Sequence, residues 1–137
     1  MPTLEELLRA SLKGANEKFD QANKALHAAV VDAAKAVEAV TGGKAVLRLH
    51  KMIENEGSTD YTLRVEAGTE SRALTDFTVT KKGYPITRNA RQGVHAEQFD
   101  SPEQLSAYFQ KLASDPDSPL VAFLAYVVRN QPDPIPL

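Results

Sequence analysis

The sequence predicts an α+β fold, in which a long N-terminal helix precedes a small antiparallel sheet and two closing helices. Apolar residues recur every three or four positions over residues 4–41, a spacing typical of one helix face. Over residues 44–87 the period changes to two, which indicates half-buried strands. Two capping sequences containing proline then open helices within residues 101–130. We therefore expect one domain over residues 1–131 and a flexible proline-rich tail over residues 132–137.

Both ends of the first helix have local signals. Thr3 and Glu6 form a capping box, and Gly42 with Gly43 favours the left-handed backbone that ends a helix. Gly14 costs about 1 kcal/mol relative to alanine, so a break near residues 13–16 is the alternative to one continuous helix. A continuous helix of this length spans about 57 Å, whereas a compact domain of this size is only ~37 Å across. The helix must therefore break, or project and pack against a second subunit.

Alternating residues predict a three- to four-stranded antiparallel meander, because the connections are too short for crossover helices. Turn-forming residues separate the strands at residues 55–58 and 68–71, and Lys82-Gly83 suits a hairpin to a short fourth strand. Residues 88–100 lack periodicity and are interpreted as a loop. The side chains expected to face the core are Ala45, Leu47, Leu49, Ile53, Tyr61, Leu63, Val65, Ala67, Ala73, Thr75, Phe77, Val79 and Ile86.

Two helices should close the domain and pack on one face of this sheet. Ser101-Pro102 opens the first, and Gln104 can close the capping box. Ser118-Pro119 opens the second, which is apolar nearly all round and is therefore expected to be buried.

No sequence pattern indicates catalysis, a metal or a cofactor. The chain has no cysteine, no nucleophile elbow and no glycine-rich phosphate loop. Its three histidines lack metal-ligand spacing, and His95 with Glu97 resembles part of a zinc-deaminase motif without the required cysteines. We expect a non-enzymatic protein. The acidic N-terminus and the absence of a long apolar run favour a cytoplasmic location without membrane insertion.

The polar phase of the strands is the first candidate binding surface, and a protein partner is its expected ligand. Phosphate-backbone binding to nucleic acid is the alternative, although Tyr61 and Phe77 fall in the apolar phase and leave no stacking platform. A solvated face with cross-strand ion pairs also fits the pattern. The candidate partner-binding residues, on the sheet face and its adjoining loop, are Arg48, His50, Arg64, Lys81, Lys82, Arg88 and Arg91.

The first helix is the second candidate surface. Its surplus length and small apolar residues predict a homodimer in which the N-terminal halves either pair antiparallel or clasp the partner. The chain is therefore interpreted as a small protein-interaction module, such as an adaptor, a chaperone-like binder or an inhibitor of a larger protein. The expected dimer-interface residues are Leu8, Leu12, Ala15, Phe19, Ala22 and Leu26.

Overall fold

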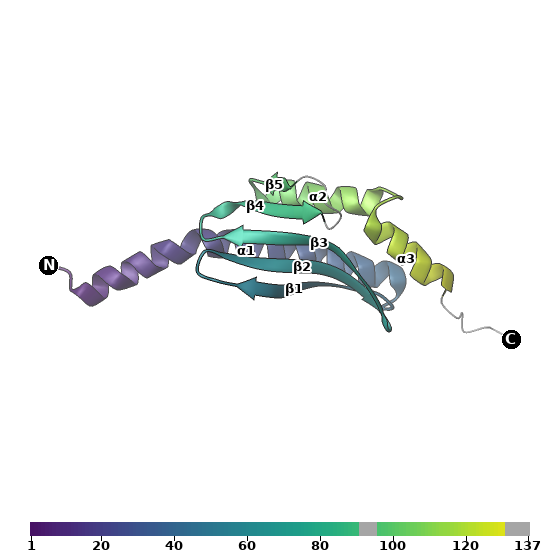
Figure 1. The fold of residues 1–137 in the computed structure, drawn as a ribbon, viewed down its shortest axis with the longest axis horizontal. Helices are drawn as coiled ribbons and strands as arrows, with labels where there is room; N and C mark the ends of the chain where they lie inside the picture. Colours follow the sequence, from purple (N-terminus) through teal and green to yellow (C-terminus); the bar gives the residue numbers. More distant parts are fainter. Residues whose placement is uncertain (91–95, 131–137) are drawn as a thin grey trace.

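The computed structural model describes residues 1–90 and 96–130, and it has the predicted α+β fold (Figure 1). One long helix leads into a five-stranded antiparallel sheet, and two shorter helices follow. The elements are α1 (Leu4–Thr41), β1 (Val46–Glu54), β2 (Ser58–Ala67), β3 (Glu70–Thr80), β4 (Gly83–Ala90), β5 (Glu97–Phe99), α2 (Pro102–Ser114) and α3 (Pro119–Asn130).

α1 is continuous through Gly14, so the alternative of a break does not occur. The Thr3 hydroxyl accepts a hydrogen bond from the Glu6 amide at 3.1 Å, as the capping box requires. At the other end, Gly42 adopts a left-handed conformation, with φ of 62°. The first buried residue of α1 is Ala22, and the helix N-terminal to it extends beyond the sheet (Figure 1).

The strands pair in the order β1-β2-β3-β4-β5, so the sheet is a simple meander. β5 was not expected, because the sequence around it was interpreted as a loop. Its three residues pair with Ile86–Arg88 of β4. A strand this short is recognised only from its pairing with a neighbouring strand, since three residues are too few to show an alternation in the sequence.

Two irregularities in strand register change the predicted inward and outward phases. Leu63 pairs with Thr75 but Arg64 pairs with Ala73, so Leu74 is an extra residue, and it is buried instead of outward-facing. A second irregularity, in β1, pairs Ile53 with Asp60. The prediction that Ile53 faces the core is wrong, because its side chain is 59% exposed. One inserted residue shifts all later side chains to the other face of the sheet.

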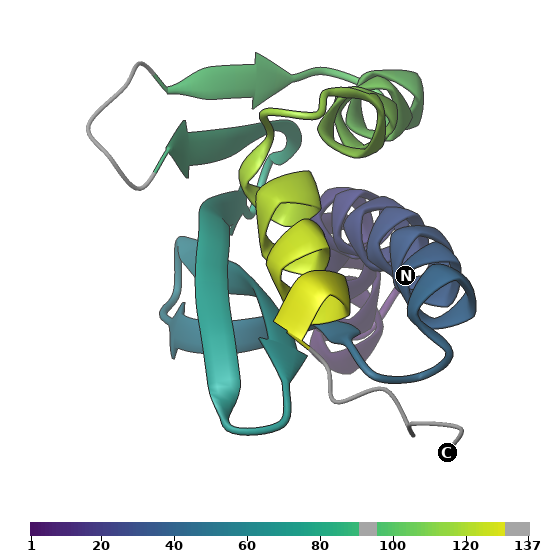
Figure 2. The same ribbon diagram turned by 90° about the vertical axis from the view of Figure 1, so that its right-hand side faces the viewer.

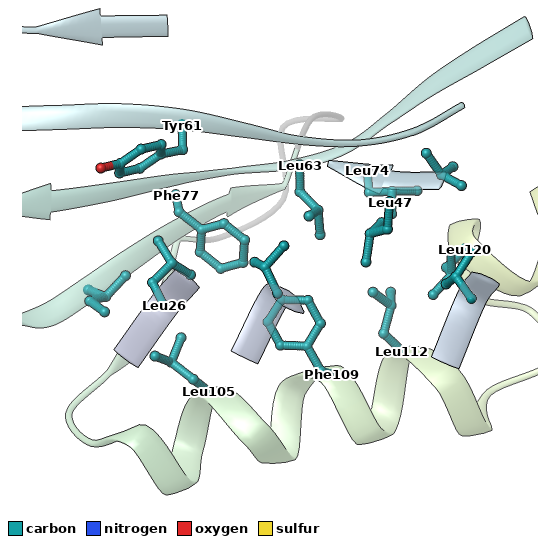
Figure 3. Packing of buried hydrophobic residues seen from close by; sticks show 14 of the residues in the cluster. Leu26, Leu47, Tyr61, Leu63, Leu74, Phe77, Leu105, Phe109, Leu112 and Leu120 are labelled. Atoms are coloured by element: carbon teal, nitrogen blue, oxygen red, sulfur yellow. The ribbon is translucent and has the colours of Figure 1, made fainter. Parts of the chain in front are cut away.

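All three helices cover the same face of the sheet, with the C-terminal half of α1 beside α2 and α3 (Figure 2). Between these layers lies one core, in which Leu26, Leu105, Phe109 and Phe77 pack closely (Figure 3). The Phe77 and Phe109 rings are 6.2 Å apart between centroids. In the described part of the chain, the helices occupy only this face of the sheet. We call the opposite face the outer sheet face.

Candidate interaction surfaces

The first candidate surface is the projecting part of α1, residues 4–19, which we call the N-terminal arm. The cap at Thr3 and the helical spacing of the leucines produce an amphipathic helix here, and its N-terminal part extends beyond the sheet (Figure 1). Leu4, Leu8 and Leu12 are 75%, 57% and 60% exposed. Such repeated exposure of leucine on one helix is a continuous apolar stripe that the chain itself leaves uncovered.

The six residues predicted for a dimer interface divide between this arm and the core. Leu8, Leu12 and Ala15 lie on the exposed arm, and Phe19 is partly buried against the core. Ala22 and Leu26 are completely buried within the single chain. These two residues therefore belong to the core and have no surface to offer to a second subunit, because the sheet and α2 already cover their side of the helix.

The second candidate surface is an apolar groove along the C-terminal half of α1, which we call the helical groove. α1, α2 and α3 form its walls, and its volume is about 540 Å³. Sequence reasoning missed it, although the alanines of α1 were a signal: small side chains there leave space between neighbouring helices. The lining residues are Ala25, Ala28, Ala29, Asp32, Ala33, Ala36, Val37 and Val40 of α1, Pro102, Ser106, Phe109, Gln110 and Ala113 of α2, and Leu120, Val121 and Leu124 of α3.

The third candidate surface is the outer sheet face, where the register of β1 and β2 brings Arg48 opposite Arg64 and His50 opposite Thr62. The basic groups have partners nearby. Glu66 lies 3.1 Å from the His50 ring and 3.9 Å from the Arg48 guanidinium. The Arg64 guanidinium donates to the Ser71 hydroxyl at 2.7 Å.

Carboxylates continue across the same face. The Thr62 hydroxyl donates to Asp76 at 2.8 Å, and the Thr78 hydroxyl donates to Asp60 at 2.6 Å. The outer sheet face is therefore of mixed charge, with Arg and His side chains interleaved with Glu and Asp. Such a pattern resembles the predicted solvated face with cross-strand pairs more than a basic surface.

The remaining residues of the predicted basic set do not gather around Arg48 and Arg64. Lys81 and Lys82 are exposed in the turn between β3 and β4. That turn follows Thr80, which pairs with Ser58 at the far end of β2, about 20 Å along the strand from Arg64. Arg91 lies outside the described residues, as does His95.

Arg88 was predicted to lie in the loop that adjoins the sheet, but it lies in β4, on the helix-covered face. It pairs with the inward-facing Phe77 across β3 and β4. Its guanidinium donates to Glu97 at 2.9 and 3.0 Å and lies 4.8 Å from the centre of the Tyr108 ring. Burial raises the pKa of Tyr108, and the nearby Arg88 charge opposes that rise. Arg88 is thus held within the chain by a carboxylate, the Thr75 hydroxyl and an aromatic face.

Another hollow, of about 630 Å³, lies beside Arg88 and is lined on its far side by α2 and the turn that follows it. Four of the five charged side chains in its lining have local roles. Glu97 binds Arg88, and Asp115 accepts a hydrogen bond from the Asp117 amide at 2.9 Å within the turn. Lys111 lies in the last turn of α2, where a positive charge favours the helix dipole. These contacts account for Arg88, Glu97, Lys111 and Asp115 without a ligand.

The remaining described histidine, His27, makes local contacts within the chain. His27 binds the Asn23 carbonyl at 2.8 Å and packs edge-on against Tyr61. Over residues 1–90 and 96–130, no group of three histidine or acidic side chains is placed to hold a metal ion. Within the same ranges, no helix has the length and apolar character needed to cross a membrane.

Comparisons with protein-family models, with curated proteins and with solved structures find no match to this chain.

Proposed function

We propose that this chain is a non-enzymatic protein-interaction module that dimerises through its N-terminal helix. The observation that carries the proposal is the exposed leucine stripe of the N-terminal arm. Full burial of a leucine side chain stabilises a complex by about 1.5–3 kcal/mol relative to exposure. An isolated helix of this length is only marginally stable in water. Packing against another polypeptide both buries the leucines and stabilises the arm.

The test compares the oligomeric state of the wild type with that of an arm variant. Replacing Leu8 and Leu12 with glutamate places two charges in the leucine stripe and should convert the dimer to a monomer. Size-exclusion chromatography with light scattering measures the mass. A matched control carries Lys13→Glu, which changes the net charge by the same two units at an exposed position on the other side of the arm and should leave the dimer intact. A wild-type chain that is monomeric at every concentration would contradict the proposal.

The outer sheet face is the surface that we propose for a protein partner. Arg48, Arg64 and His50, together with Glu66, offer donors and acceptors of both charge signs. Charged groups arranged in this way contribute to specificity and orientation more than to affinity. A partner with a complementary mixed-charge strand or loop fits this face. Nucleic-acid binding remains the alternative prediction, and the carboxylates of Asp60 and Asp76 disfavour it because they repel phosphate.

Two double variants of equal charge change separate these partners. Arg48→Glu with Arg64→Glu alters the outer sheet face, whereas Lys81→Glu with Lys82→Glu alters the distant turn. In native pull-downs, a protein partner should be lost only with the arginine pair, and both variants should unfold within about 0.5 kcal/mol of the wild type. Nucleic acid would instead give a high ratio of absorbance at 260 to 280 nm at low salt, and both variants would lower it. A large loss of stability in the arginine variant would contradict a binding role and indicate a structural one.

A further inference from the structure

We infer that the N-terminal arm of one chain lies in the helical groove of a second copy, and that the exchange is reciprocal. This inference rests on the proposed dimerisation and specifies where each arm binds. Two uncovered apolar features occur on one helix: exposed leucines at residues 4–19 and a groove wall at residues 25–40. Each feature lacks, within its own chain, the partner that the other supplies.

The position of the two features along α1 supports a two-fold arrangement. The arm and the groove wall occupy spans of equal length on either side of the helix centre. When α1 is laid antiparallel on a second α1 with full overlap, Leu8 comes level with Val37 and Leu12 with Ala33. Both arms then meet both grooves at once, which is the self-complementary contact of a closed two-fold dimer.

The side chains of the two features complement each other in size. The groove wall presents alanines, including Ala29, Ala33 and Ala36, and small residues allow a second helix to approach closely. The arm supplies leucines at positions 4, 8 and 12 to fill the space that the alanines leave. Phe109 of α2 and Leu124 of α3 complete an apolar lining for them.

The side of α1 on which the leucines lie also favours this antiparallel orientation. Leu4, Leu8 and Ala15 lie on the same face of α1 as Ala29 and Ala33, because all are separated by whole or nearly whole helical turns. In the groove this face adjoins α2 and α3. In an antiparallel pair related by a two-fold axis, equivalent sides of the two helices lie together, so the leucine side of each arm faces the other copy's α2 and α3.

The buried area is sufficient for a stable dimer only if both arms bind. A helix of ~24 Å length and ~10 Å diameter that buries half of its side covers roughly 380 Å². Two arms and two groove walls then bury about 1,500 Å² in total, within the range of standard protein interfaces. A single arm in a single groove buries about half of this, which is the size of a weak contact.

Site-specific cross-linking tests the arrangement directly, because the natural chain contains no cysteine. One variant carries Leu8→Cys on the arm and a second carries Ala36→Cys in the groove. After mixing and exchange of subunits, a short bis-maleimide should join the two variants efficiently. Neither variant alone should cross-link, since full antiparallel overlap separates the two copies of residue 8 by about 43 Å. A control mixture of Lys13→Cys with Ala36→Cys should not cross-link, because Lys13 is on the other side of the arm.

The groove side is tested by substitutions that leave the arm unchanged. Ala28→Glu with Ala36→Glu changes two exposed residues of the helical groove and should abolish the dimer at least as strongly as the arm variant. Ala39→Glu, an exposed alanine of α1 outside the groove lining, should retain it. Circular dichroism and thermal melting check that each variant folds.

The outcomes separate this inference from the proposed function. Reciprocal exchange is supported if the wild type is a dimer and both the arm and the groove variants are monomers. Cross-linking should then occur only in the mixture of Leu8→Cys with Ala36→Cys. A dimer that survives the groove substitutions, with Leu8→Cys cross-linking to itself, overturns the exchange in favour of arm-to-arm pairing, while dimerisation through the helix stands. A monomeric wild type overturns both.

Discussion

At the scale of single residues, the neighbours that a side chain meets decide its role. Arg88 was grouped by sequence with nearby basic residues, but strand pairing turns it toward Glu97 and the Tyr108 ring. Leu74 was assigned to the polar phase, but a register irregularity turns it into the core. In both cases the residue type indicated the surroundings correctly: an acidic partner for arginine and burial for leucine. The position of the residue in the sequence pattern did not indicate which face of the sheet it joins.

Replacement of Gly83 should destabilise the fold strongly. Its φ is +78°, and a Cβ atom built there would lie 2.3 Å from the Lys18 carbonyl oxygen. Gly83→Ala therefore combines left-handed strain with a backbone collision and should lower the free energy of unfolding by about 2–4 kcal/mol, measured by urea denaturation. Gly68→Ala is the control, because its φ is similar at +61° but no atom lies within 4 Å of the new Cβ. It should cost only ~1–2 kcal/mol. Equal losses at the two sites would contradict the collision between β4 and α1.

At the scale of elements, α1 has a packed half and an exposed half because only part of it meets the sheet. Ala22, Leu26 and Val30 are buried beneath the strands, whereas residues 1–18 are exposed throughout. The helix is nevertheless continuous, since helical hydrogen bonding propagates from residue to residue once a helix is nucleated. The packed half thus provides a nucleated helix from which the arm extends. The arm can therefore form a helix without packing against other parts of its own chain.

The corner between α2 and α3 depends on the buried hydroxyl of Ser118. It donates to the Leu112 carbonyl at 2.6 Å and accepts from the Val121 amide at 3.1 Å, so it joins the end of one helix to the start of the next. Ser118→Ala should lower the free energy of unfolding by about 1–3 kcal/mol, because it removes a helix cap and leaves a buried carbonyl without its donor. Ser114→Ala, at an exposed serine with a long 3.4 Å contact, should change it by less than ~0.5 kcal/mol. Thermal or urea unfolding distinguishes them, and a Ser118 variant as stable as wild type would show that the corner is held by packing alone.

At the scale of the whole molecule, the domain consists of a packed body and an arm that lacks a covering layer. The body contains a continuous apolar core shared by the sheet and all three helices. Over the described residues, no buried side-chain polar atom lacks a hydrogen-bond partner. The body therefore buries its apolar side chains within one chain, whereas the leucines of the arm remain exposed.

Two leucine substitutions in the same helix separate body from arm. Leu26 is completely buried, so Leu26→Ala should lower the free energy of unfolding by about 2–5 kcal/mol at any protein concentration. Leu12 is 60% exposed, so Leu12→Ala should cost less than about 1 kcal/mol in dilute solution. At high concentration, where a dimer adds stability, Leu12→Ala should also reduce the rise of Tm with protein concentration. Denaturation across a concentration series measures both effects, and a concentration-independent Tm for wild type and variant alike would argue against an arm-mediated dimer.

The sequence predicts which helix and strand faces carry the candidate residues, but it does not predict the contacts between residues of different elements. The helical spacing identified the leucines at positions 8 and 12, and the alternation identified Arg48, His50 and Arg64 as outward-facing. It did not show that Glu66 lies beside two of them, because residues 48 and 66 become neighbours only through pairing of β1 with β2. The helical groove was missed for the same reason, since three separate helices form it.

Sequence alone was sufficient to predict the order of the elements apart from β5, their antiparallel arrangement and the caps at Thr3 and Ser101, because these depend on residues close together in the chain. Tertiary structure alone decided where α1 leaves the sheet, which strands contain an extra residue and which face Arg88 joins. These features depend on the relative lengths of packed elements and on pairing between distant residues. Local periodicity gives no information about either of them. The apolar stripe in the sequence therefore predicted that the helix packs against something, but it did not show which half of the helix remains exposed.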